Sequence, residues 1–378
     1  MTLSIEEATG ANGEEIKYTS IKYRGFNNVL SITDTSVHVT EVVVKAIEKA
    51  QEVLGAHVRH VVAGAGIDVS DVEQVVTSAF GSELLVYQCQ GHLMRRMLTE
   101  ITSNNQECLL SQLKEVLQLV AEKPDIHLNL ATAGLPPPPQ PTAFETDLRE
   151  TIEYFTTNWG RLADVMTQTD NPDMESMDVL NDVNARQILY DILAALTLIE
   201  RALARLEKDN ATLGDAVEVW LDIMEEAKQI DSQHVRDVLE QEAGQVLKQV
   251  RMLSVNLLDP RYFGVRLQPP EMRKIMEHSQ LAHPEITTDM MKFIARTSPY
   301  DFNNINSDNP TVWWTAGRRL GFNEELCDVA MKLVTAAPTA GNANTSLNLS
   351  DVTTQALSHL DSDRAERYIF CYTVFHNK

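Results

Sequence analysis

The chain has 378 residues and a formal net charge of −22 at pH 7, with 43% hydrophobic and 23% charged residues. This composition is typical of a folded protein, and the length allows two or three structural units with a sizeable core. No apolar run approaches the roughly 18 residues that span a bilayer, so we predict that the chain is not a membrane protein. The excess of acidic residues also disfavours nucleic-acid binding, which depends on lysine and arginine neutralising phosphates.

The first 101 residues change repeatedly between strand and helix periodicity. Alternating apolar and polar residues predict strands, and apolar residues at helical spacing predict helices with capping residues at their ends. The expected elements are strands at 3–5, 17–23 and 28–33, a helix from Thr40 to Gly55, a strand at 58–63, a helix opened by Ser70, a strand at 83–87 and a helix at 93–101. Three hairpin-connected strands followed by this alternation match the element order of a ribonuclease-H-like core.

Residues 102–305 are expected to form an all-helical insertion. Apolar residues recur at helical spacing between residues 143 and 258, which predicts helices that pack as a bundle. The run Gly134-Leu-Pro-Pro-Pro-Pro-Gln-Pro141 cannot continue a helix, because proline lacks the backbone donor and fixes φ. We expect a stiff linker at 134–141, with recognition by a partner that binds Pro-x-x-Pro segments as the alternative.

Residues 306–378 are expected to complete the core from the other end of the chain. The stretch 309–338 carries apolar residues at helical spacing, including the adjacent Trp313 and Trp314. Neighbouring residues on a helix point about 100° apart, so one tryptophan can face the core while the other packs on a neighbouring element or subunit.

Several phrases, in the same order, resemble hAT-type transposases, the hobo/Activator superfamily. They are a Cys-x-x-His after the fifth strand, the run 211–221, the Asp-Pro-Arg in 257–264 and the tryptophan helix. The motif residues are Cys89, His92, Asp259, Pro260 and Arg261. The resemblance implies a ribonuclease-H-like fold interrupted by a helical insertion. It also implies an association region with contacts at Trp313, Trp314, Phe322, Leu326 and Ala330. The family's BED-type zinc finger, its usual DNA-reading module, is not expected here.

A zinc ion at Cys89 and His92 would need two more ligands, and the sequence has no second closely spaced pair. We therefore expect these two residues to have a packing or local hydrogen-bonding role. The four cysteines are widely separated, and residues 1–7 lack a secretory pattern. We expect free thiols in a reducing compartment, nuclear or cytoplasmic, with the nucleus favoured by the resemblance.

An active enzyme of this fold needs carboxylates from the first strand, the end of the fourth strand and a late helix to hold two divalent ions. Glu6 and Glu7 are available at the first strand. At the second position a small-residue turn with Ala65 precedes Asp68, and at the third position stands Thr345. Two of the three acids are missing, so we expect no bound metal and no cofactor.

In that case Glu6 and Glu7 should lie at the surface, and Asp68 should help to start a helix. His57 and His60 flank a strand and are expected to be solvated.

The sequence therefore favours a non-enzymatic, domesticated relative of hAT transposases. We expect it to act through protein partners or a homodimer, in a nuclear assembly for transcription, chromatin or transposon control. The alternatives are a residual metal-dependent nuclease, using Glu6, Asp68 and an acid such as Asp351, and a nucleic-acid-binding protein without catalysis.

Overall fold

A computed structural model describes residues 1–9, 15–23, 26–34, 37–55, 57–64, 66–81, 84–103, 105–142, 147–168, 174–301 and 308–339. Contacts divide the chain into two units. The first comprises residues 1–93, 203–221 and those from Gln245 on, and the second comprises 94–202 and 222–244. None of the helices in the described ranges combines the length and low charge that a bilayer-crossing segment needs.

The first unit contains a mixed five-stranded sheet. Its strands are β1 (Thr2–Thr9), β2 (Glu15–Tyr23), β3 (Phe26–Asp34), β4 (His60–Ala63) and β5 (Leu85–Gln88). They lie in the order β3-β2-β1-β4-β5. β2 is antiparallel to β1 and to β3, while β1 and β4, and β4 and β5, are parallel. The five expected strands are therefore present.

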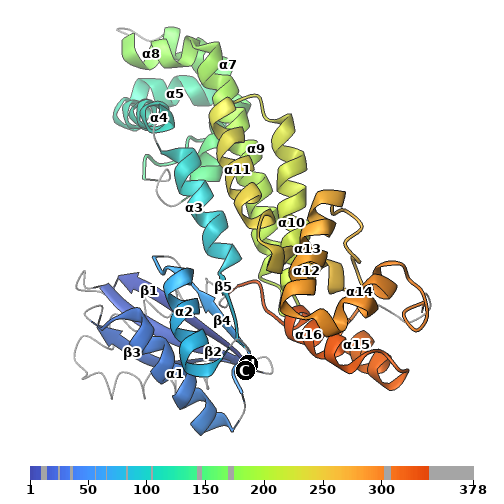
Figure 1. Cartoon of the computed structure of the whole chain (residues 1–378). Helices are drawn as coiled ribbons and strands as arrows, with labels where there is room; N and C mark the ends of the chain where they lie inside the picture. The colour runs from blue at the N-terminus through green and yellow to red at the C-terminus, as the bar shows by residue number, and fades with distance from the viewer. Residues whose placement is uncertain are drawn as a thin grey trace. The chain divides into compact units, whose positions relative to one another are not determined.

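Alternation along β1 explains the core of the sheet. Leu3 and Ile5 are fully buried and pack with the apolar faces of α1 (Val39–Leu54) and α2 (Val69–Phe80). Figure 1 shows both helices in front of the strands. The helix α1 ends at Gly55, as predicted, because its φ of 57° suits glycine. The cap of α2 is Asp68, two residues before the Ser70 that the sequence favoured.

The helical part of the chain does not form one unit, contrary to the predicted boundaries of 102–305. Helices follow one another as α3 (Gln90–Thr102), α4 (Asn105–Glu122), α5 (Pro124–Thr132), α7 (Leu148–Thr167), α8 (Met174–Asn181), α9 (Val183–Leu206), α10 (Leu213–Glu226), η1 (Ala227–Gln229) and α11 (Gln233–Leu247). Then come α12 (Val250–Leu258), α13 (Pro269–Ala282), η2 (Pro284–Ile286), α14 (Thr287–Ile294), α15 (Pro310–Arg319) and α16 (Glu324–Val334). The unit boundaries fall inside α3, α9, α10 and α11. Helical periodicity shows that a face is apolar, but not which element covers it.

An aromatic core lies among α12 to α16 in the first unit. It consists of Phe263, Phe293, Tyr300, Trp313, Trp314 and Phe322. The rings of Trp313 and Trp314 lie 4.9 Å apart between centroids, and Trp314 stacks on Phe293 at 5.3 Å. The Trp314 indole Nε1 donates to the Leu258 carbonyl at 2.9 Å. A side chain at Gly317 would overlap the ring of Phe322, so the glycine permits this packing.

The predicted association residues are part of this interior. Trp313, Trp314, Phe322, Leu326 and Ala330 are each between 0% and 3% exposed. They cannot form a contact surface in this conformation, so that assignment is corrected. The sequence pattern showed that both tryptophans need apolar neighbours, and the chain itself supplies them from α12 and α14.

The proline-rich run lies inside the second unit, between α5 and α7. It connects these two helices within the unit, and its stiffness stays a prediction. Of the segment that was expected to complete the core, residues 340–378 lie outside the described ranges.

Candidate functional site

Glu6 stands where the first acid of the predicted catalytic set belongs, and it is buried. Its exposed fraction is 7%. The prediction that Glu6 lies at the surface is therefore wrong. The side chain of Glu7, and the whole of Ala65 and Thr345, lie outside the described residues.

The backbone at the end of β4 closes against Glu6. The amide of Gly64 donates to the Ile5 carbonyl at 2.7 Å. A Cβ atom at Gly64 would lie 2.8 Å from Cγ of Glu6 and 3.0 Å from the Ile5 oxygen. Real side chains do not approach this closely, so the position that directly follows β4 favours glycine.

The Cys-x-x-His pair lies beside the same glutamate. Nε2 of His92, on α3, is 3.6 Å from a carboxylate oxygen of Glu6. Cys89 is 2% exposed, and its amide donates to the Ala63 carbonyl at 2.7 Å. The buried thiol fits the expected packing role, whereas the contact between His92 and Glu6 had no signal in the sequence. We call Glu6, Gly64 and His92 the Glu6 site.

Asp68 is engaged in starting α2. Its Oδ1 accepts from the Ser70 amide at 2.7 Å, which is the hydrogen bond of an N-cap. The expectation that this residue starts the helix is confirmed. Within the described ranges, no group of three or more histidine, cysteine, aspartate or glutamate side chains is arranged to hold a metal ion.

The motif Asp259-Pro-Arg261 forms a second buried polar site. Arg261 donates to Asp259 at 2.7 Å and to Asp215 at 2.9 Å. It also donates to the hydroxyl of Thr212 at 2.8 Å, and Tyr262 donates to Asp215 at 2.5 Å. These five residues are the Arg261 network. It joins the beginning of α10 to the end of α12, where Pro260 follows the last helical turn.

The Arg261 network places one cation between two largely buried carboxylates. The side chain of Asp259 is 0% exposed and that of Arg261 18%. Burial alone would lower the pKa of Arg261, but its hydrogen bonds and the charges of both aspartates raise the pKa above its usual value. Burial would raise the pKa of Asp215, and the donors Tyr262 and Arg261 bring that pKa below normal. At Asp259 burial outweighs the contacts with Arg261, so the pKa of this carboxyl is raised above its usual value.

Gly214 makes the close approach of α10 possible. A Cβ atom there would lie 2.5 Å from Oδ2 of Asp259. The two hAT-like phrases, 211–221 and 257–264, thus meet at this glycine and this aspartate. The sequence singled out both phrases, but their contact depends on packing between helices that are distant in the chain.

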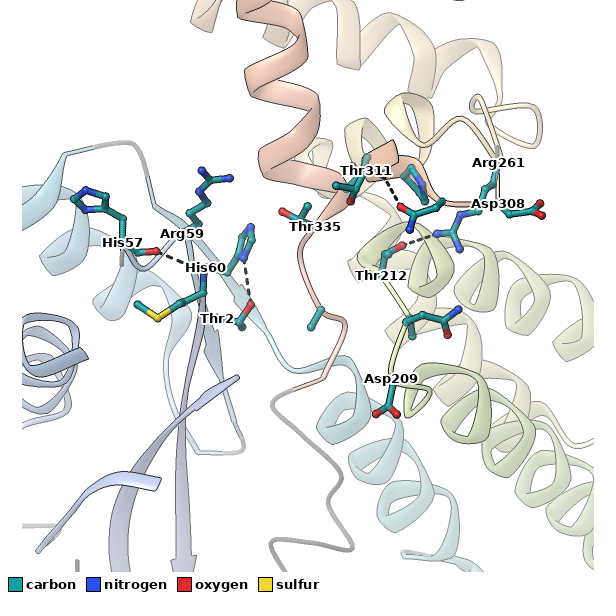
Figure 2. Close-up of a pocket in the computed structure, with 17 residues that line it drawn as sticks. Thr2, His57, Arg59, His60, Asp209, Thr212, Arg261, Asp308, Thr311 and Thr335 are labelled. Atoms are coloured by element: carbon teal, nitrogen blue, oxygen red, sulfur yellow. Dashed lines mark hydrogen bonds between the residues drawn. The ribbon is translucent and has the colours of Figure 1, made fainter. Parts of the chain in front are cut away.

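A cavity of about 630 Å³ lies between the beginnings of β1 and β4 and the N-terminal ends of α10 and α15. Figure 2 shows His57 and Arg59 on one side, with Thr212, Asp308 and Arg261 on the other. The helix ends offer few unused donors. Asn309 accepts from the amides of Thr311 and Val312, at 3.0 and 3.3 Å. The geometry therefore does not build an anion site.

His60 lies at the wall of this cavity and is 2% exposed. Its Nε2 contacts the Lys332 carbonyl at 2.7 Å, and its Nδ1 contacts the Thr2 hydroxyl at 3.2 Å. A neutral ring with the proton on Nε2 satisfies both partners. Burial lowers the pKa of His60 to about 4. The prediction that it is solvated is wrong, whereas the neighbouring His57 is exposed as predicted.

Neither a comparison with protein-family models nor a comparison with curated proteins gives a match to this chain. The relationship to hAT transposases therefore stays a prediction that rests on the residues quoted above.

Proposed function

We propose that this protein is a ribonuclease-H-like scaffold, derived from an hAT transposase, that binds other proteins and does not cut nucleic acid. Its setting would be a nuclear assembly for transcription, chromatin or transposon control. The strand order β3-β2-β1-β4-β5, with β2 antiparallel to its neighbours, supports a core of this type. The helices α1 and α2 between β3, β4 and β5 also fit it.

The contact between Gly64 and Glu6 carries the proposal that catalysis is lost. Two-metal phosphoryl transfer requires acids from neighbouring elements to converge on two ions. Here the backbone of Gly64, just after β4, lies close to Glu6, and the nearby Asp68 caps α2. His92 contacts Glu6 from α3 at 3.6 Å. The described surroundings of Glu6 therefore include the backbone at Gly64 and the imidazole of His92.

The charge of the chain favours proteins over nucleic acids as partners. With 54 acidic and 32 basic residues, the surface repels phosphates on average. A protein partner with a basic or uncharged contact surface meets no such barrier. The contact surface itself is left open, because the tryptophan helix α15 turns its two indoles into the core.

A cleavage assay tests the loss of catalysis. Purified chain is incubated with supercoiled DNA and either Mg²⁺ or Mn²⁺, alongside the Glu6→Gln variant. We expect the same background nicking for both proteins. Metal-dependent cleavage that is present in the wild type and abolished in Glu6→Gln would overturn the proposal, provided that circular dichroism shows an equal helical content for both.

Purification from native extract tests the association with proteins. The tagged full chain is isolated before and after digestion of the extract with a nonspecific nuclease. We expect the co-purifying proteins to remain after digestion. Loss of all of them would favour the nucleic-acid-binding alternative, and a salt-dependent gel shift would then support it.

A further inference from the structure

A proline-rich tract is displayed on the second unit, between α5 and α7. It comprises residues 136–141, with the sequence Pro-Pro-Pro-Pro-Gln-Pro, and forms neither helix nor strand. Pro136, Pro137 and Gln140 are exposed, and the other three residues are half-buried. The tract is thus held at the surface and is accessible along most of its length.

The beginning of the tract is fixed to the helices that precede and follow it. Gly134 has a φ of 68° and ends α5. The Leu135 amide then donates to the Leu130 carbonyl at 3.0 Å, and the leucine side chain is 7% exposed. From α7, Arg161 donates to the Ala133 carbonyl. These contacts lie within one unit, so the tract does not separate two moving parts.

The chemistry of the tract is that of a preformed ligand. Each proline ring fixes φ near −65°, and a residue before proline is restricted to extended conformations. The four consecutive prolines 136–139 therefore favour the polyproline II helix, which rises about 3.1 Å per residue. Prolines have no amide hydrogen, so this tract cannot pair as a strand. What it offers to a partner is ring faces and carbonyl oxygens.

The tract is also uncharged in a strongly acidic chain. No aspartate, glutamate, lysine or arginine occurs from residue 126 to residue 144, although the chain has 54 acidic residues. A partner therefore gains little from charge and must bind through apolar surface and hydrogen bonds. Grooves lined by aromatic side chains, which bind polyproline II helices, have this character.

We propose that residues 136–141 are a docking site for a protein module with an aromatic-lined groove that binds polyproline II helices. The little conformational freedom left to the tract before binding lowers the entropic cost of association. This inference goes beyond the proposed function. It concerns the second unit, and it can fail or succeed whatever the cleavage assay at Glu6 shows.

Titration of the full chain with purified SH3 and WW modules, followed by calorimetry, tests this inference. The variant Pro137→Ala/Pro138→Ala shortens the rigid helix, and Pro284→Ala, an exposed proline of η2, is the matched control. We expect at least one module to bind the wild type and the control equally. The double variant should bind about tenfold more weakly, with an unchanged unfolding midpoint.

Added salt should leave the affinity nearly unchanged, because the tract carries no charge. Absence of binding to both modules, or equal binding to the double variant, would overturn the proposal. If the double variant is destabilised, the module affinity of the single variant Pro137→Ala, at an exposed residue, is compared with that of the wild type instead.

Discussion

The Arg261 network and the Glu6 site both bury a carboxylate in the first unit, but different groups surround that carboxylate. Asp259 is 0% exposed and receives donors from Arg261, which also holds Asp215. Glu6 is 7% exposed and lies against the bare backbone of Gly64 and beside His92. The first arrangement neutralises acids with a fixed cation, and the second fills the space beside an acid with backbone.

This difference separates a structural pairing of acids from the arrangement that a two-metal catalytic set requires. A carboxylate whose oxygens are held by arginine is not available as a ligand for a metal ion. An acid in a catalytic set must keep space and further carboxylates beside it. The Arg261 network meets the first description, and the described residues around Glu6 do not show the second.

The largest effect is expected from Arg261→Met. The substitution leaves Asp259 buried without its cation, which typically lowers the free energy of unfolding by about 3–5 kcal/mol. Urea denaturation followed by circular dichroism measures the loss. The exposed Arg319, on α15, is the control, and Arg319→Ala should change stability by less than about 0.5 kcal/mol. Equal stabilities of the two variants would show that the network is dispensable.

The sheet face that carries Glu6 also carries His60. This buried imidazole is neutral and, among the described residues, is not paired with an acid. Burial lowers the pKa of His60 to about 4 in the folded chain, from the usual 6.5 of a solvated histidine. The unfolded chain therefore binds the extra proton between these values. Stability from this group is complete above pH 6.5, falls as the pH drops towards 4, and amounts to about 3 kcal/mol in total.

His60→Gln retains a donor and an acceptor but cannot titrate. We expect urea denaturation at pH 7 and pH 4 to show a smaller loss of stability for this variant than for the wild type. Parallel pH profiles of the two proteins would contradict the assignment of a buried, neutral His60.

Two glycines mark the close contacts at the two sites. A Cβ atom at Gly214 would meet Asp259, and one at Gly64 would meet Glu6. We expect each substitution by alanine to cost about 1–3 kcal/mol through overpacking. Gly244, inside α11, has no atom within 4 Å of its would-be Cβ, so Gly244→Ala should be neutral or stabilising by about 0.5–1 kcal/mol.

A double-mutant cycle sharpens the comparison at the Glu6 site. Glu6→Ala removes the Cγ atom that Gly64→Ala would meet, so the double variant should recover part of the loss. Strict additivity in urea denaturation would mean that the two residues are not in contact.

The smallest effect is expected from Asp68→Ala. Loss of the N-cap of α2 should lower the free energy of unfolding by about 1 kcal/mol. The exposed Glu48 on α1 serves as the control, with an expected change below about 0.5 kcal/mol. If Asp68 instead cooperates with Glu6 in a cation site, added Mn²⁺ would stabilise the wild type and not Asp68→Ala.

The sequence predicted the strands, the first two helices and the stop at Gly55, because these depend on local alternation and capping. It did not predict the burial of Glu6 or His60. Alternation shows that these residues face away from Leu3 and Ile5, but not that the second face is covered. The pairing of Arg261 with Asp215 joins residues that are 46 positions apart, and no local pattern reports such a contact.

The placement of the indoles gives the molecule a built-in optical reporter. Trp220, Trp313 and Trp314 are buried in the first unit, and Trp159 is buried in α7 of the second. These are all four tryptophans of the chain. Replacing Trp159 by phenylalanine therefore leaves fluorescence from the first unit alone, and the difference from the wild-type melting curve reports the second unit without any added dye.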